Sequence, residues 1–151
     1  IVGRSLLSDH ELKSRGVHKY LNTIGFKKSQ YLFGLFESKQ NIIDQDEVYV
    51  VEGQFDLIKA WECGLKNIVA LGTSNMTNYQ FSVICRYTNN IILLLDNDEA
   101  GQKGRDLIYK KFANLANIQN WYVPEPYKDI DEYLTKEKIN KCEDMSFVVK
   151  M

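Results

Sequence analysis

The chain has 151 residues, of which 44% are hydrophobic and 26% are charged, so it can form one folded domain and is not a disordered chain. The net charge of −1 gives no overall sign of a nucleic-acid partner, although a local basic patch can be hidden in that balance. No apolar run is long enough to span a membrane and no signal peptide is visible, so we expect a cytoplasmic protein without a membrane partner.

The cysteines and the first residue add two expectations. Cys63, Cys85 and Cys142 are far apart and form no C-x-x-C pair, so we expect reduced thiols and no zinc site. The chain begins at Ile1 without a methionine and reaches its polar motifs quickly. We therefore expect it to be an excised piece of something longer.

Residues 1–45 interleave basic and aromatic side chains. The set comprises Arg4, Lys13, Arg15, His18, Lys19, Lys27, Lys28 and Lys39 with Tyr20, Phe26, Tyr31, Phe33 and Phe36. This mixture suits contact with a nucleic-acid backbone or a triphosphate. A plain solvated face is the alternative, and the residues alone leave both open. We place a domain boundary near residues 41–46.

Residues 46–136 alternate between strand and helix patterns. Strands are expected at residues 47–51, 67–71, 90–95 and 119–123, and helices at 54–63, 77–86, 99–115 and 129–138. This order predicts an α/β fold with a mostly parallel sheet of about four strands, flanked by helices. Residues 137–151 carry weak signals, and we expect a helix that leads toward a missing helical region.

Acidic residues follow three of these strands. Glu52 comes directly after the first, Asp96 and Asp98 after the third, and Asp129 and Asp131 shortly after the fourth. The carboxyl ends of parallel strands meet at one edge, where ligands gather. Clustered carboxylates repel one another unless a cation compensates them, and an all-oxygen set favours Mg²⁺ or Mn²⁺. The D-x-D spacing lets both aspartates face one ion.

A structural interpretation competes with this one. A single acid after a strand is usually a helix cap or a solvated loop residue, and we favour that for Asp129 taken alone. Acids after three different strands make caps an insufficient account of the whole set. Glu99 begins a helix, where it interacts with the helix dipole, so we treat it as structural. We expect Lys103 and Arg105 on the same helix to be solvated.

Three stretches carry a family resemblance. "VVEGQFD" (residues 50–56), "LLLDNDEAG" (93–101) and "KDIDEYL" (128–134) resemble the three motifs of a Toprim domain, which primases, topoisomerases, some nucleases and recombination proteins share. "ALGTSNMT" (70–77), "RYTNN" (86–90) and "HKYLNTIGFKKSQYLFGL" (18–35) are similar to the bacterial-type (DnaG-type) DNA primases in particular. The resemblance covers the chain from about Gly3 to Leu134.

The resemblance implies synthesis of short RNA primers on single-stranded DNA from ribonucleoside triphosphates, by metal-dependent nucleotidyl transfer. It implies that 1–45 ends the basic part of the polymerase domain, that 46–136 is the Toprim domain, and that a replicative helicase is contacted through regions absent here. It also implies two or more Mg²⁺ or Mn²⁺ ions and no zinc in this fragment. In the family, part of the nucleotide and template surface comes from a half of the polymerase domain that is mostly absent here, so inactivity of the isolated fragment is compatible with the resemblance. Asn97 stands where many members have glycine, and we expect little effect because asparagine tolerates unusual backbone angles.

The resemblance also assigns roles to residues. Glu52, Asp96 and Asp98 would be the central catalytic and metal-binding acids, completed by Asp56, Asp129 and Asp131. Nucleotide and template would be held by Arg4, Lys19, Asn22, Lys28, Gly72 and Thr73. Gly53 would let the backbone turn sharply after the first strand. Two alternatives stay open: a Toprim-type nuclease that hydrolyses phosphodiesters, and a non-catalytic module that binds metal and DNA.

Overall fold

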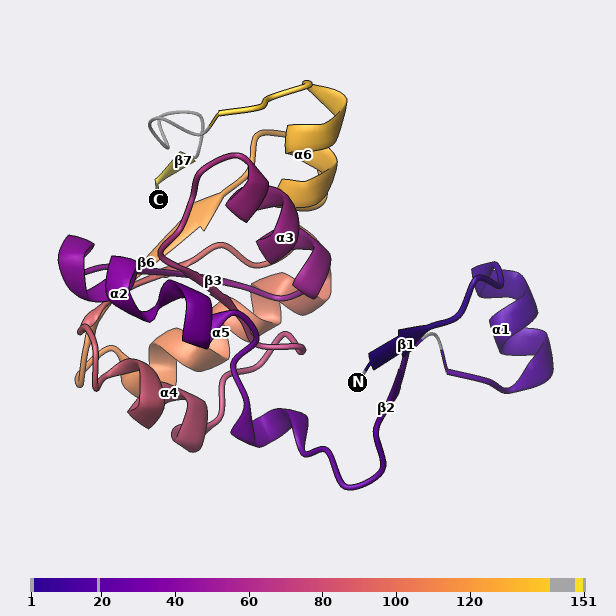
Figure 1. The fold of residues 1–151 in the computed structure, drawn as a ribbon, viewed down its shortest axis with the longest axis horizontal. Coiled ribbons are helices and arrows are strands. Elements are labelled where there is room, and N and C mark those ends of the chain that lie inside the picture. The colour runs from indigo at the N-terminus through magenta and orange to yellow at the C-terminus, as the bar shows by residue number, and fades with distance from the viewer. Residues whose placement is uncertain (1, 19, 142–148, 151) are drawn as a thin grey trace.

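A computed structural model describes residues 2–18, 20–141 and 149–150 of the chain. Its centre is a sheet in the order β4 (Ile68–Ala70), β3 (Val48–Val51), β5 (Asn90–Leu93) and β6 (Asn117–Tyr122), and these four strands run parallel. This arrangement confirms the predicted α/β fold class, with β5 two residues shorter than expected and β6 starting two residues earlier (Figure 1).

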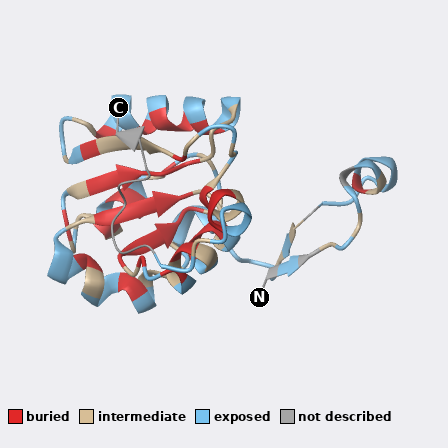
Figure 2. Cartoon of the chain, turned by 90° about the horizontal axis from the view of Figure 1, so that it is seen from above, coloured by how far each residue is buried: buried red, intermediate tan, exposed pale blue. Residues whose placement is uncertain are grey.

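Helices cover both faces of the sheet. On one face α3 (Gln54–Glu62) and α6 (Ile130–Lys136) pack on Tyr49, Val51 and Ile92. On the other face α2 (Leu35–Gln45), α4 (Asn78–Ile84) and α5 (Glu99–Phe112) pack on the alternate strand residues, which include Val50, Leu93 and Ile91. Because both faces are covered, every residue of β3 and β4 is buried (Figure 2).

The first residues form a separate small unit. Here β1 (Val2–Arg4) pairs antiparallel with β2 (Tyr20–Asn22), and α1 (Asp9–Arg15) lies between them in the chain. A capping box between Ser8 and Glu11 begins α1. This unit stands off the body on the side to which the strands of the sheet point (Figure 2). The short helix η1 (Lys28–Gln30) lies on the connection to the body.

The C-terminal segment differs from the expected helix. Helix α6 ends at Lys136, and β7 (Val149–Lys150) pairs antiparallel with Trp121 and Tyr122 of β6. The parts of the expected helix at 142–148 and 151 lie outside the described residues. Across the described ranges, no helix is both long and apolar enough to cross a bilayer.

The central strands predict where the fold is most sensitive. Ile92 of β5 is fully buried, whereas Ile43 of α2 is 49% exposed. Ile92→Ala should lower the free energy of unfolding by about 2–5 kcal/mol, because it leaves a cavity between tightly packed layers. The matched change Ile43→Ala should cost less than about 1 kcal/mol. Urea denaturation of both variants measures the difference, and equal losses would contradict this packing.

Candidate active site

The acidic residues meet at the carboxyl edge of the sheet. Glu52 follows β3, and burial together with the charges of Asp96 and Asp98 raises its pKa from 4.5 to about 7. Asp56 is buried in the first turn of α3, and burial together with Asp129 and Asp96 raises its pKa from 3.8 to about 7. Carboxylates that follow three different strands therefore repel one another in a partly desolvated site.

Lys128 is the cationic group bound to the two central aspartates. Its Nζ atom lies 2.8 Å from Oδ2 of Asp96 and 3.4 Å from Oδ2 of Asp98. The hydrogen bond to Asp96 raises the pKa of Lys128. Burial nevertheless raises the pKa of Asp96, whose side chain is only 13% exposed, and Lys128 offsets that effect in part. Both carboxylates of the D-x-D pair thus contact one positive charge.

Three of the acids also serve as helix caps. Asp98 accepts a hydrogen bond from the backbone N–H of Gly101, which lowers the pKa of Asp98, and Asp129 accepts one from Glu132. Asp56 accepts one from the N–H of Gly53. The structural interpretation therefore holds for these three residues. It does not account for the partly buried carboxylates of Glu52 and Asp96.

Two glycines let the backbone approach the acids closely. A Cβ atom on Gly101 would overlap the carbonyl oxygen of Asp96, so α5 packs directly against the acidic loop. A Cβ atom on Gly53 would lie 2.5 Å from Oδ2 of Asp56. Gly53 has φ −99°, which any residue can adopt. The expected reason for this glycine, a sharp turn, was wrong, and the reason is the space that Asp56 needs.

Arg105 was predicted to be solvated, and that prediction was wrong. Its side chain is fully buried, and the guanidinium donates hydrogen bonds to the carbonyl oxygens of Leu95 and Asp96. The sequence held a signal for this burial. Gly101, Gly104, Arg105 and Ile108 follow the i, i+3, i+4, i+7 spacing of the inward face of a helix, and all four are buried.

A buried glutamine positions the basic segment. The Nε2 atom of Gln80 donates to the carbonyl oxygens of Tyr31 (2.8 Å), Leu71 (3.2 Å) and Lys28 (3.3 Å). Thr77, the predicted N-cap of α4, donates from Oγ1 to the carbonyl oxygen of Ser29 at 2.7 Å. These bonds hold η1 against the loop after β4, and the side chain of Lys28 passes beside Gly72.

The other residues predicted to bind nucleotide or template come from the loop after β4 and from the N-terminal unit. The N–H of Gly72 donates to the carbonyl oxygen of Glu52 at 2.9 Å, so in this structure it is not directed at a bound phosphate. Thr73 is exposed and its hydroxyl donates to the carbonyl oxygen of Asn75. Arg4 lies on β1, where it pairs with Tyr20, and Asn22 lies on β2, where it pairs with Val2. In the N-terminal unit these strands lie nearer the body than α1 does (Figure 1), and Lys19 lies outside the described residues.

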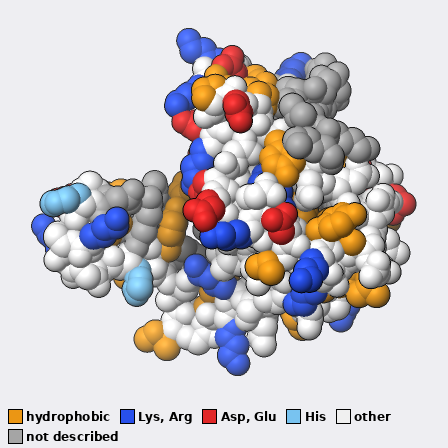
Figure 3. All heavy atoms as spheres, turned by 180° about the vertical axis from the view of Figure 1, so that it is seen from behind, with side chains coloured by type: hydrophobic (Ala, Val, Ile, Leu, Met, Phe, Trp, Pro, Cys, Tyr) orange, Lys and Arg blue, Asp and Glu red, His pale blue; other side chains and the backbone are white. Residues whose placement is uncertain are grey.

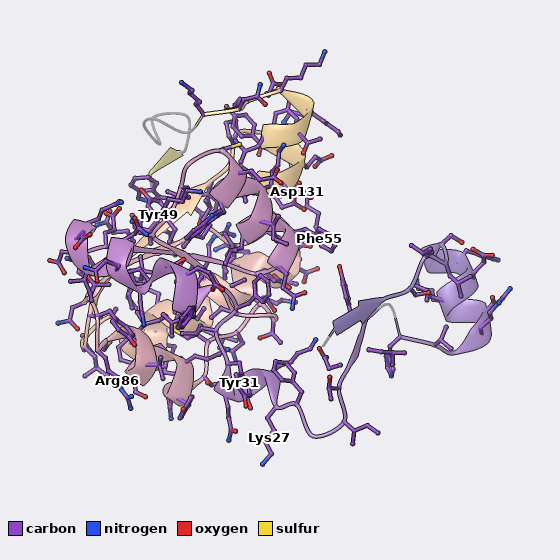
Figure 4. All side chains as sticks on the ribbon, in the orientation of Figure 1. Lys27, Tyr31, Tyr49, Phe55, Arg86 and Asp131 are labelled. Atoms are coloured by element: carbon purple, nitrogen blue, oxygen red, sulfur yellow. The ribbon has the colours of Figure 1, made fainter. Side chains whose placement is uncertain are left out.

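Charges of both signs lie where the N-terminal unit meets the body. Figure 3 shows acidic side chains among lysine and arginine side chains on this face. Figure 4 places Asp131 and Phe55 on the side of the body that faces this unit, with Lys27 and Tyr31 on the connection. The N–H of Asp131 contacts Oδ1 of Asp56 at 3.4 Å, so α3 and α6 meet at the acidic cluster.

The donor set fits a hard divalent cation in its chemistry. Within residues 2–18, 20–141 and 149–150, no three His, Cys, Asp or Glu side chains are arranged closely enough to hold one metal ion. The acids nevertheless supply oxygen ligands only, and burial, followed by the charges of neighbouring carboxylates, raises the pKa values of Glu52 and Asp56. Among the described residues, the ammonium group of Lys128 contacts both Asp96 and Asp98.

Known proteins share this fold and sequence. Residues 49–134 match the Toprim-like family. The chain belongs to that family. It is 36% identical over 121 residues to the DNA primase of Aquifex aeolicus and 37% identical over 131 residues to that of Synechococcus elongatus. These alignments cover 77% and 80% of the chain, but only 24% and 19% of the two primases.

Solved structures extend the match beyond the Toprim-like residues. The Aquifex aeolicus primase, with its zinc-binding and RNA polymerase domains, aligns with a TM-score of 0.73 at 32% identity, over 89% of this chain and 33% of that one. A DnaG primase catalytic domain bound to single-stranded DNA aligns at 0.67 and 28% identity, over 90% of this chain and 43% of that one. The chain is therefore homologous to part of the bacterial primase catalytic core.

The raised pKa values of Glu52 and Asp56 predict an unusual pH dependence of stability. Between about pH 4.5 and 7 the folded protein holds more protons on these groups than the unfolded chain, so its free energy of unfolding should fall as the pH rises. Asp98, whose pKa is lowered, changes protonation below this window. Urea denaturation in EDTA should therefore give a lower stability at pH 8 than at pH 5.

Two controls test the cause of this pH dependence. Glu52→Gln should remove part of the fall, since a neutral amide pays no charge penalty at either pH. Saturating Mn²⁺ should raise the stability at pH 8 much more than at pH 5, because the cation binds the ionised acids. A stability that stays flat or rises between pH 5 and 8 would contradict the electrostatic account of the cluster.

Proposed function

We propose that this chain is the Toprim part, with the adjoining basic segment, of a DNA primase. In this proposal it takes part in template-directed synthesis of short RNA primers on single-stranded DNA by nucleotidyl transfer. The observation that carries the proposal is the acidic cluster at the carboxyl edge with the basic segment fastened beside it. The similarity to primases covers both the acidic cluster and the basic segment, whereas the match to the Toprim-like family begins only at residue 49.

The acids would hold two or more Mg²⁺ or Mn²⁺ ions. Glu52, Asp96 and Asp98 would be the central ligands and catalytic residues, and the outer ligands would be Asp56, Asp129 and Asp131. Such ions, when bound, lower the pKa of an attacking hydroxyl and neutralise charge on a reacting phosphate. The cap bonds of Asp98 and Asp129 each use one carboxylate oxygen, Oδ1, and leave Oδ2 for a ligand.

Lys128 would change partners when the site is loaded. In the free protein its ammonium group offsets the charge of Asp96 and Asp98. A divalent cation supplies more positive charge at the same carboxylates and would release Lys128, which is about half exposed and has a flexible side chain. The released ammonium group would be available to a phosphate of the nucleotide at the edge of the site.

Nucleotide and template would be bound from the basic segment. Lys28 passes beside Gly72 and is exposed, so its ammonium group can reach a phosphate at the carboxyl edge. Thr73 on the same loop, together with Arg4, Lys19 and Asn22 from the N-terminal unit, would complete that surface. The single-stranded DNA in the homologous DnaG structure supports a template as partner. A helicase would be contacted by regions beyond those matched here.

The proposed domain organisation follows from these roles. Residues 1–45 would belong to the basic part of the polymerase domain and residues 46–136 to the Toprim domain. Residues 137–151 would lead to a further region. The fastening of η1 by Gln80 and Thr77 supports a junction between the first two parts that is fixed and not a free linker.

An assay with three readouts tests the function. The chain is incubated with single-stranded DNA, ribonucleoside triphosphates and Mn²⁺, and the products are separated by size. We expect short RNA products that disappear in the Asp96→Asn/Asp98→Asn variant and persist in Asp106→Asn, which changes an acid on the exposed face of α5. Cut DNA would instead indicate a Toprim nuclease, and binding without any product would indicate a non-catalytic module. Either result would overturn primer synthesis by this chain.

Lys28 allows a separate test of the binding surface. Lys28→Ala should weaken binding to single-stranded DNA and reduce the slope of log K against log salt by about one, because one phosphate contact is lost. Lys110→Ala, which removes an exposed lysine near the far end of α5, should leave the slope unchanged. Fluorescence anisotropy at several salt concentrations measures both slopes. Equal slopes in all three proteins would exclude Lys28 from the interface.

A further inference from the structure

Arg105 is a buried cation with an unusual set of partners. Its Nη1 atom donates to the carbonyl oxygen of Asp96 at 2.9 Å, Nη2 donates to that of Leu95, and the guanidinium lies 4.2 Å from the ring centre of Tyr122. No carboxylate forms an ion pair with it among the described residues, and its Nε atom has no hydrogen-bond partner there. Burying a charge in this way is costly, so the contacts that it makes to the acidic loop need a reason.

Asn97 connects the same loop to a second one. Its Nδ2 atom donates to the carbonyl oxygens of Val123 (2.9 Å) and Tyr127 (3.0 Å), and its backbone N–H donates to that of Lys128 at 2.6 Å. Its Oδ1 atom lies 3.5 Å from Nη2 of Arg105. Arg105 and Asn97 together therefore tie the loop after β5 to the segment between β6 and α6. Asn97 is thus a structural link between the two loops.

We propose that Arg105 and Asn97 are positioning residues that set Asp96 and Asp98 against Lys128, Asp129 and Asp131 before any ligand binds. A planar guanidinium can hold two consecutive carbonyl groups at once, which fixes the direction in which the side chain of Asp96 leaves the backbone. The consequence for metal binding rests on the proposed function of the acids. The ordering of the two loops is independent of that function, and it can be measured without metal.

A purely electrostatic role and a positioning role for Arg105 predict opposite changes in metal affinity when Arg105 is removed. A positive charge beneath a cation site repels the cation, so removing it would tighten binding if charge were all that mattered. A positioning role predicts weaker binding after the same change, because the carboxylates lose their arrangement. The sign of the change therefore distinguishes the two roles. Arg105→Lys adds a second distinction, since it keeps the charge but cannot hold both carbonyl groups.

The first experiment is amide hydrogen exchange measured by NMR in EDTA. In Arg105→Met and in Asn97→Gly we expect the amides of the acidic loop, above all that of residue 97, to exchange about ten-fold faster or more. The amide of Tyr49, which bonds to Asn67 at the opposite edge of the sheet, should change much less. Ile108→Val, a mild change at a buried site on the same helix, is the control for a general loss of stability.

The outcomes of this experiment are decisive. Faster exchange confined to the acidic loop in either variant supports the proposal, and Asn97→Gly decides it if Arg105→Met does not fold. Acceleration no greater at residue 97 than at Tyr49, or equal acceleration in Ile108→Val, would overturn it.

The second experiment measures Mn²⁺ affinity by electron paramagnetic resonance. We expect affinity about ten-fold weaker in Arg105→Met and Asn97→Gly, an intermediate loss in Arg105→Lys, and a double variant that loses less than the sum of the single losses. Tighter or unchanged binding in Arg105→Met would overturn the positioning role. If the wild-type chain binds no Mn²⁺, the proposed function of the acids fails, and the exchange experiment still decides the role of Arg105 and Asn97.

Discussion

The desolvation of carboxylates at the end of a buried parallel sheet is the constraint on which the rest of this structure depends. The strand before Asp96 packs between two layers of helices, so Asp96 emerges into a partly desolvated site beside other carboxylates. Positive charge must reach them from elsewhere. Lys128 supplies it from the solvent side through contacts to Asp96 and Asp98, and Arg105 holds the backbone of the same loop from within the protein. A bound cation would replace the charge of Lys128 but not the hydrogen bonds of Arg105.

The helix caps show how one side chain can serve the fold and the site together. Asp98 and Asp129 each use Oδ1 to begin a helix, which fixes the rotamer of the carboxylate at no further entropic cost. Asp56 accepts the N–H of Gly53 at Oδ2 in the first turn of α3, and its Oδ1 contacts the N–H of Asp131. The N-termini of α3, α5 and α6, which pack on the core, therefore also orient these three acids.

The parts of this account that were predictable from sequence are those set by local pattern. Alternating strands and helices indicated the parallel sheet, and acids placed directly after strands indicated the edge where they meet. The sequence did not predict that Lys128 contacts the Asp96 carboxylate or that Arg105 holds the Asp96 backbone. Local periodicity relates residues within one helix or strand, and these contacts join different segments. Arg105 looked like one of several charges on a solvated helix, and only the spacing of Gly101, Gly104 and Ile108 around it marked the inward face. The fastening of η1 by Gln80 joins residues 49 positions apart and left no local signal.

The central claim is that Asp96 and Asp98 form the centre of a divalent-metal site. Calorimetric titration of Mn²⁺ into the wild-type chain, the Asp96→Asn/Asp98→Asn variant and the Glu99→Gln/Asp106→Asn variant tests it most directly, because the second pair of acids lies exposed on the same helix region. The account predicts saturable binding in the wild type and in the exposed-acid variant, and none in the variant of the D-x-D pair. Binding that survives the loss of both aspartates, or no binding in the wild type, would contradict it.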